Sequence, residues 1–110
     1  NQKLHRIPPG PLHVKIQLAL EKNDELILRY QENPLISIQS ADLENGRGSV
    51  ELLIDKCVAE IFIDGGMRYI AKELPATTNP HGLELSTEQA GSILDRLEVY
   101  RMESMWRTHG

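Results

Sequence analysis

The stretch that decides the fold is VELLIDKCVAEIFIDGGMRYIAKE, residues 50–73. Its pattern predicts three short strands joined by two tight turns. The second turn, Asp64-Gly65-Gly66, is a strong hairpin signal, because a two-residue turn that matches the twist of its strands needs positive φ. The first turn is centred on Lys56-Cys57, with Asp55 at its entrance, and residues 58–63 are rich in the β-branched and aromatic side chains that favour strands. We predict a β-meander at the centre of an all-β domain.

Apolar and polar residues alternate in several segments outside this meander. Alternation with a period of two is typical of a strand that buries one face. It predicts further strands at 14–20, 26–30, 35–38, 83–85 and 93–102. In the last of these, we expect Leu97 and Val99 to face the core. About eight strands, frequent turn signals and little or no helix predict a two-sheet antiparallel β-sandwich of the concanavalin A-like or jelly-roll type.

The two ends of the chain lack this alternation. Residues 1–12 include Ile7-Pro8-Pro9-Gly10-Pro11, in which the prolines remove backbone donors and fix φ. We therefore predict a linker or N-terminal segment over 1–12, one β-sandwich domain over 13–106 and a C-terminal tail over 107–110. A length of 110 residues suits a single domain with a modest core. Because the first residue is not Met, we expect the chain to be a piece of a longer protein.

The net charge limits the kinds of partner that the chain is expected to bind. The formal net charge is −4 and the pI is about 5.5, which argues against nucleic acid and anionic membrane surfaces, since both select for basic patches. No apolar run approaches the ~18 residues of a membrane span. Cys57 is the only cysteine, which excludes an internal disulfide and a thiolate metal cluster. We expect neither nucleic acid nor membrane as a partner.

Candidate catalytic and metal-binding residues are few. Asp55 and Glu60 flank the first turn and could form the carboxylate pair that a glycosidase needs. The turn position of Asp55 favours hydrogen bonds to backbone amides instead, and the strand position of Glu60 favours a cross-strand Lys or Arg. The four histidines have no metal-binding spacing: His5, His13, His81 and His109. These patterns predict no catalytic residue, no metal site and no cofactor, and they identify no carbohydrate-binding residue.

Five residues of the meander form a motif: Asp55, Glu60, Phe62, Asp64 and Gly65. This motif resembles the signature of the C-terminal β-sandwich of family 32 glycoside hydrolases, the β-fructosidases of the invertase, levanase and inulinase type. Lys56 and Cys57 stand where that family usually has Arg and Ser. Residues 82–85 and the segment from Leu97 to Trp106 are similar to later parts of the same module, so that the resemblance covers residues 48–106.

In that family, catalysis belongs to a separate β-propeller, and none of the propeller's catalytic motifs occurs in this sequence. The resemblance implies a non-catalytic accessory sandwich, not an enzyme by itself, that braces a propeller on the same or a separate chain. It also implies that Phe62, Met105 and Trp106 contact that propeller. The parent enzyme would be a retaining β-fructosidase that acts on sucrose or fructans, and we expect it to be periplasmic or secreted.

Two other functions stay open. A free-standing carbohydrate-binding module for fructan or another polysaccharide would show exposed, coplanar aromatic side chains, and aromatic residues are only 5% of the chain. An enzyme that uses Asp55 and Glu60 would hydrolyse its substrate as an isolated chain.

Overall fold

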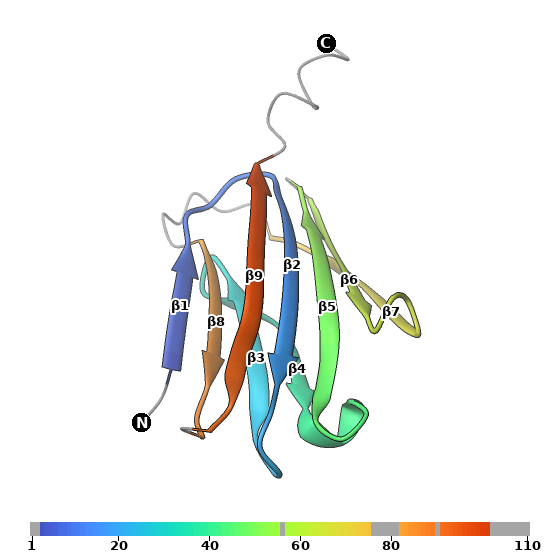
Figure 1. The fold of residues 1–110 in the computed structure, drawn as a ribbon. Coiled ribbons are helices and arrows are strands. Elements are labelled where there is room, and N and C mark those ends of the chain that lie inside the picture. The colour runs from blue at the N-terminus through green and yellow to red at the C-terminus, as the bar shows by residue number, and fades with distance from the viewer. Residues whose placement is uncertain (1–2, 56, 76–81, 90, 102–110) are drawn as a thin grey trace.

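Two antiparallel β-sheets pack face to face in the computed structural model of the chain (Figure 1). The structure describes residues 3–55, 57–75, 82–89 and 91–101. One sheet has four strands, in the order β1 (Lys3–Ile7), β8 (Leu83–Thr87), β3 (Glu25–Tyr30), β4 (Asn33–Gln39). The other has five strands, in the order β7 (Arg68–Glu73), β6 (Val58–Ile63), β5 (Arg47–Ile54), β2 (Leu12–Ala19), β9 (Ile93–Arg101). The predicted antiparallel β-sandwich is confirmed, and the helix within the described ranges is a 3-10 turn at Ser40–Asp42.

The predicted meander forms strands β5, β6 and β7. The Asp55 amide donates to the Val58 carbonyl at 3.0 Å and closes the first turn. The second turn is left-handed, with φ of 51°, 68° and 99° at Asp64, Gly65 and Gly66. Glycine takes such angles without steric cost, which explains why the turn signal in the sequence was reliable.

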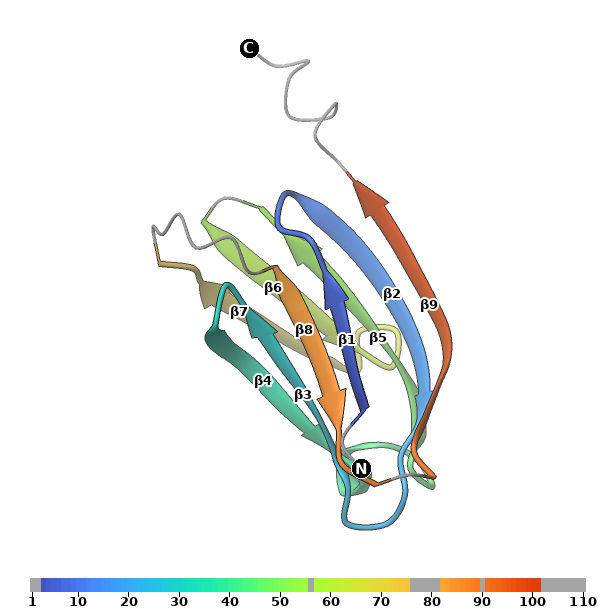
Figure 2. The same ribbon diagram turned by 90° about the vertical axis from the view of Figure 1, so that its left-hand side faces the viewer.

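The core lies between the two sheets and takes alternate residues from each strand. The five-stranded sheet buries Val14, Ile16, Leu18, Val50, Leu52, Ile54, Ala59, Ile61 and Ile63. The four-stranded sheet buries Leu26, Leu28, Ile38, Leu83 and Leu85 against them. Figures 1 and 2 show the two layers with their strands running along roughly the same axis. Since these strands turn their apolar residues inward, their polar side chains lie on the outer faces.

Strand β1 is a ninth strand that the sequence did not predict. Lys3–Ile7 pairs antiparallel with β8, so part of the predicted linker or N-terminal segment over 1–12 is a strand of the sandwich. The prolines exclude a central strand only where they stand, and the residues before them are free to pair. The Arg101 side chain then donates to the carbonyls of Pro8 and Pro9, at 3.2 and 2.9 Å, and fixes the crossing from β1 to the other sheet.

Strand β9 lies at an edge of the five-stranded sheet, with β2 as its neighbour. Leu97 packs against the core as predicted. Val99 lies opposite buried Val14 and so points to the same inner face, as predicted, but it stays 39% exposed because β9 is an edge strand. Within the described ranges no strand pairs with the far side of β9, and its side chains are therefore covered from one side only.

A buried carboxylate joins two loops at one end of the sandwich. Asp24, before β3, is 3% exposed and accepts hydrogen bonds from Ser92 Oγ and from the amides of Glu25, Glu88 and Gln89. Burial by itself raises the pKa of Asp24, but the hydrogen bonds outweigh burial and hold the pKa below its ordinary value of 3.8. We call this cluster the Asp24 junction.

Candidate functional site

Two neighbouring rows of side chains on the outer face of the five-stranded sheet form the candidate site. Strand register defines them, because residues opposite each other on neighbouring strands point to the same face. The first row runs across all five strands: Glu98, Lys15, Glu51, Phe62 and Tyr69. The second row contains Arg96, Gln17 and Ser49. Polar residues at alternate positions of β2 and β9 thus become one surface.

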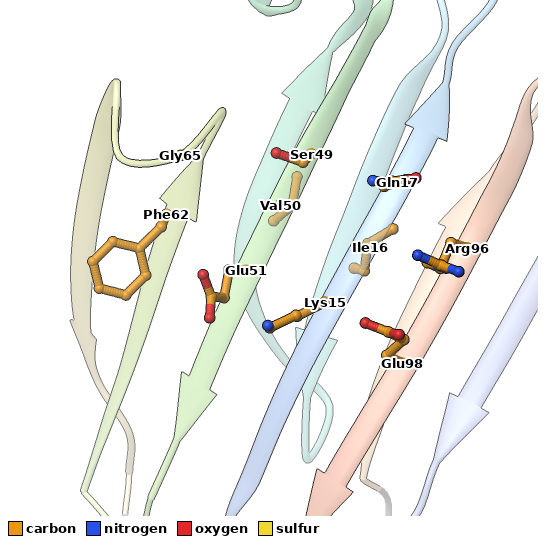
Figure 3. A pocket seen from close by; sticks show the side chains of 10 residues that line it. All are labelled: Lys15, Ile16, Gln17, Ser49, Val50, Glu51, Phe62, Gly65, Arg96 and Glu98. Carbon is orange, nitrogen blue, oxygen red and sulfur yellow. The ribbon is translucent and has the colours of Figure 1, made fainter.

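A hollow of about 310 Å³ lies over these rows, and we call it the outer-face groove (Figure 3). Its polar lining comes from β2, β5 and β9: Lys15, Gln17, Ser49, Glu51, Arg96 and Glu98. Phe62 of β6 stands at one side of it. The groove therefore combines charged groups, an amide, a hydroxyl and one aromatic ring.

The charges in the outer-face groove balance. Lys15 lies between Glu51 and Glu98 in the strand register, and Figure 3 shows its amine on the side of Glu51. The Glu51 carboxylate also forms a hydrogen bond with His13 Nε2. Within the described residues, four lining side chains have no hydrogen bond or ion pair to the protein: Lys15, Gln17, Arg96 and Glu98. Their donors and acceptors are available to solvent or to a ligand.

Two aromatic pairs lie beside the groove. The rings of Phe62 and Tyr69 have centroids 5.0 Å apart, those of His13 and Tyr100 have centroids 5.8 Å apart, and both pairs are tilted by 44°. The Tyr69 hydroxyl donates to Glu60 at 2.6 Å, and this hydrogen bond raises the pKa of Tyr69 above its ordinary value of 10.0. Because the rings are tilted, neither pair offers a flat stacking platform.

The two motif aspartates hold the turns of the meander. Asp55 Oδ1 accepts hydrogen bonds from the amides of Cys57 and Val58, each at 2.7 Å, as its turn position predicted. Asp64 bridges β6 to β5, because its amide donates to the Ser49 carbonyl at 2.8 Å and its Oδ1 accepts from the Ser49 amide at 3.0 Å. Gly65 completes the second turn at positive φ.

The other motif residues face outward. Glu60 bonds to Tyr69, where the sequence had favoured a Lys or Arg partner. Phe62 is half-buried against Tyr69. The carboxylates of Asp55 and Glu60 have separate partners, and no hydrogen bond joins them within the described residues. Met105 and Trp106 lie outside the described residues.

The described part of the chain contains no group of three His, Cys, Asp or Glu side chains placed to hold a metal ion. It also contains no helix with the length and apolar character needed to cross a membrane.

The sequence singled out Phe62 and Gly65 among the residues that line the outer-face groove, but none of its polar residues. Lys15 and Gln17 belong to β2, whereas Arg96 and Glu98 belong to β9, near the other end of the chain. In the sequence, each pair shows only the alternation that is typical of the solvent-facing side of a strand. The two pairs lie side by side only because β2 pairs with β9, and no local sequence pattern encodes that pairing.

Comparison with known proteins adds a likeness at the level of the fold. No protein-family model matches the sequence, and no curated protein matches it significantly. Among solved structures, sheep galectin-11 in complex with glycerol is similar, with a TM-score of 0.56 and 13% sequence identity over 91% of this chain and 98% of that chain. At this identity, the likeness shows the β-sandwich fold alone.

Proposed function

We propose that this chain is the non-catalytic accessory sandwich of a family 32-like glycoside hydrolase, a retaining β-fructosidase that acts on sucrose or fructans. Its role would be to brace a separate catalytic β-propeller. The observation that carries the proposal is that the motif shared with those sandwiches occupies the meander. Asp55 and Asp64 each hold a turn there through backbone hydrogen bonds.

The hydrogen-bonding of the two candidate catalytic carboxylates supports a bracing role over catalysis. Hydrolysis of a glycoside needs one carboxyl group to act as acid and a second to act as nucleophile or base across the same bond. Asp55 is engaged by two backbone amides and Glu60 by the Tyr69 hydroxyl. We therefore expect the isolated chain to release no fructose from sucrose or fructan.

The surface over β6 and β7 fits the proposed contact with the propeller. Tyr69 is 52% exposed, and its ring lies against the half-buried ring of Phe62. Met67, in the turn between β6 and β7, is 84% exposed. A cluster of exposed apolar side chains on a soluble domain marks a contact surface. We assign the Phe62–Tyr69 pair, together with Met67 in the adjoining turn, to the propeller contact.

A domain replacement tests the proposal. This chain would replace the C-terminal sandwich of a β-fructosidase, and the chimera would be compared with the same chimera carrying Phe62→Ala. We expect Phe62→Ala to shorten the half-life of sucrose hydrolysis at elevated temperature and to leave the initial kcat unchanged. Leu4→Ala is the matched control, because Leu4 is an exposed apolar residue on the other sheet. Loss of kcat without loss of half-life would contradict the proposal.

A free-standing carbohydrate-binding module is the second candidate function. The outer-face groove favours it, because charged, amide and aromatic groups line the same hollow. The tilt of the aromatic pairs argues against the coplanar platform that a polysaccharide surface would require. Binding of fructan by the isolated chain, together with failure of the chimera to gain stability, would favour this function over bracing.

A further inference from the structure

We propose that the outer-face groove is a binding site for a neutral saccharide of one or two rings. The proposal rests on the second candidate function, carbohydrate binding at the outer-face groove, and names the class of its ligand; it does not depend on the bracing role, since the groove lies within this chain. The groove gathers solvent-accessible hydrogen-bonding side chains from strands β2 and β9 on one surface, and three arguments follow from its chemistry, charge and size.

The groove offers the hydrogen-bonding groups that sugar hydroxyls require. Lys15 and Arg96 are donors, Glu98 is an acceptor, and the Gln17 amide is both. A sugar hydroxyl donates one hydrogen bond and accepts others, so vicinal hydroxyls match a mixed array of this kind. In the described residues these side chains have no protein partner, and a bound sugar would therefore not have to break an internal hydrogen bond.

The charge of the groove selects a neutral ligand. Its two basic side chains, Lys15 and Arg96, are matched by two carboxylates, Glu51 and Glu98. A phosphate or carboxylate ligand would meet repulsion from the glutamates, and a cation would meet repulsion from the basic pair. A neutral polyhydroxylated molecule is not penalised by either set.

The size and the aromatic geometry limit the length of the saccharide. A volume of about 310 Å³ lies at the small end of the ~300–1,000 Å³ range of ligand sites, which suits one or two rings. Phe62 gives one ring face at the side of the groove, and the 44° tilt to Tyr69 prevents a second sugar from stacking in the same plane. We therefore expect recognition mainly by hydrogen bonds.

Titration of the 110-residue chain with fructose, sucrose and maltose, followed by backbone amide NMR, tests the proposal. We expect saturable shifts with at least one of these sugars, confined to the outer face of β2, β5 and β9. Arg96→Ala should weaken that binding about tenfold, because it removes charge-assisted hydrogen bonds to the ligand. Arg29→Ala is the matched control, since Arg29 is exposed on the four-stranded sheet and should leave the affinity unchanged.

Several results would overturn the site. These are the absence of saturable shifts with all three sugars, shifts located on the four-stranded sheet, or equal effects of Arg96→Ala and Arg29→Ala. Tighter binding of fructose 6-phosphate than of fructose would contradict the proposal that the ligand is neutral. A thermal melt of each variant checks that it is folded, and Gln17→Ala supplies a second groove variant if Arg96→Ala is not. The chimera experiment measures the bracing role separately from sugar binding. Failure of one proposal therefore does not imply failure of the other.

Discussion

The Asp24 junction and the outer-face groove are both polar clusters assembled from segments far apart in the sequence, but they differ in where their hydrogen bonds go. At the junction, a carboxylate that is 3% exposed receives four hydrogen bonds from within the chain. In the groove, four polar side chains have no partner among the described residues. Buried polar groups must be satisfied internally, and they then contribute to stability. The groove side chains contribute little to stability and are available for binding.

The largest expected effect is at the junction. Asp24→Asn replaces a carboxylate, which only accepts hydrogen bonds, by an amide. The NH₂ group of the amide would then face N–H and O–H donors, from which it cannot accept a hydrogen bond. We expect the free energy of unfolding to fall by about 3 kcal/mol, measured by urea denaturation at neutral pH. Asp95→Asn is the control, since Asp95 is exposed and 4.0 Å from its Arg47 partner. Similar losses of unfolding free energy for Asp24→Asn and Asp95→Asn would mean that the Asp24 junction stabilises the fold no more than an exposed surface carboxylate does.

Acid should remove the contribution of Asp24. Its folded-state pKa lies below the ordinary value, so the ionised carboxylate stabilises the fold at pH values above its pKa in the unfolded chain. This stability is lost as the pH falls below 3.8 and through the lowered folded-state pKa. We expect the difference in unfolding free energy between the wild-type chain and Asp24→Asn to shrink over that interval. A constant difference from neutral pH to strongly acidic pH would show that ionisation of Asp24 is not its source.

The turn at Asp64 should give an intermediate effect. Asp64→Ala removes the side-chain acceptor of the Ser49 amide and places a residue with a Cβ and no polar group at φ of 51°. We expect a loss of about 1–2 kcal/mol in unfolding free energy. Asp64→Asn keeps a side-chain oxygen and tolerates the left-handed region, and it should cost less than half as much. Equal costs would mean that the hydrogen bond to Ser49 contributes nothing.

The smallest effect on stability should come from the groove. Gln17→Ala and Arg96→Ala remove exposed side chains without a protein partner, so each should change the free energy of unfolding by less than about 0.5 kcal/mol. The same urea series measures both variants. A loss of unfolding free energy as large as that of Asp64→Ala would show that these side chains stabilise the fold. It would weaken the case for a ligand site.

The sequence predicted the parts of the structure that depend on neighbouring residues. The meander over residues 50–73 was predictable because alternation sets its buried faces and Asp64-Gly65-Gly66 sets its turn. Strand β1 was not predicted, because the prolines after Ile7 indicated a linker and because β1 pairs only with distant β8. Asp24 had the appearance of an ordinary turn residue, since its main partner Ser92 comes from a remote loop. The groove depends on the same kind of non-local pairing.

The position of β2 has a consequence for how the protein is made. β2 lies between β5 and β9, so one of its edges pairs with a strand that follows all the others in the sequence. Folding dominated by such distant pairings is slow, typically milliseconds to seconds, because the loop must close before the contacts form. During synthesis, the meander can form first while one edge of β2 stays open until β9 emerges from the ribosome. In that interval the open edge can pair with a neighbouring chain, and a chaperone that covers it would raise the yield of folded protein.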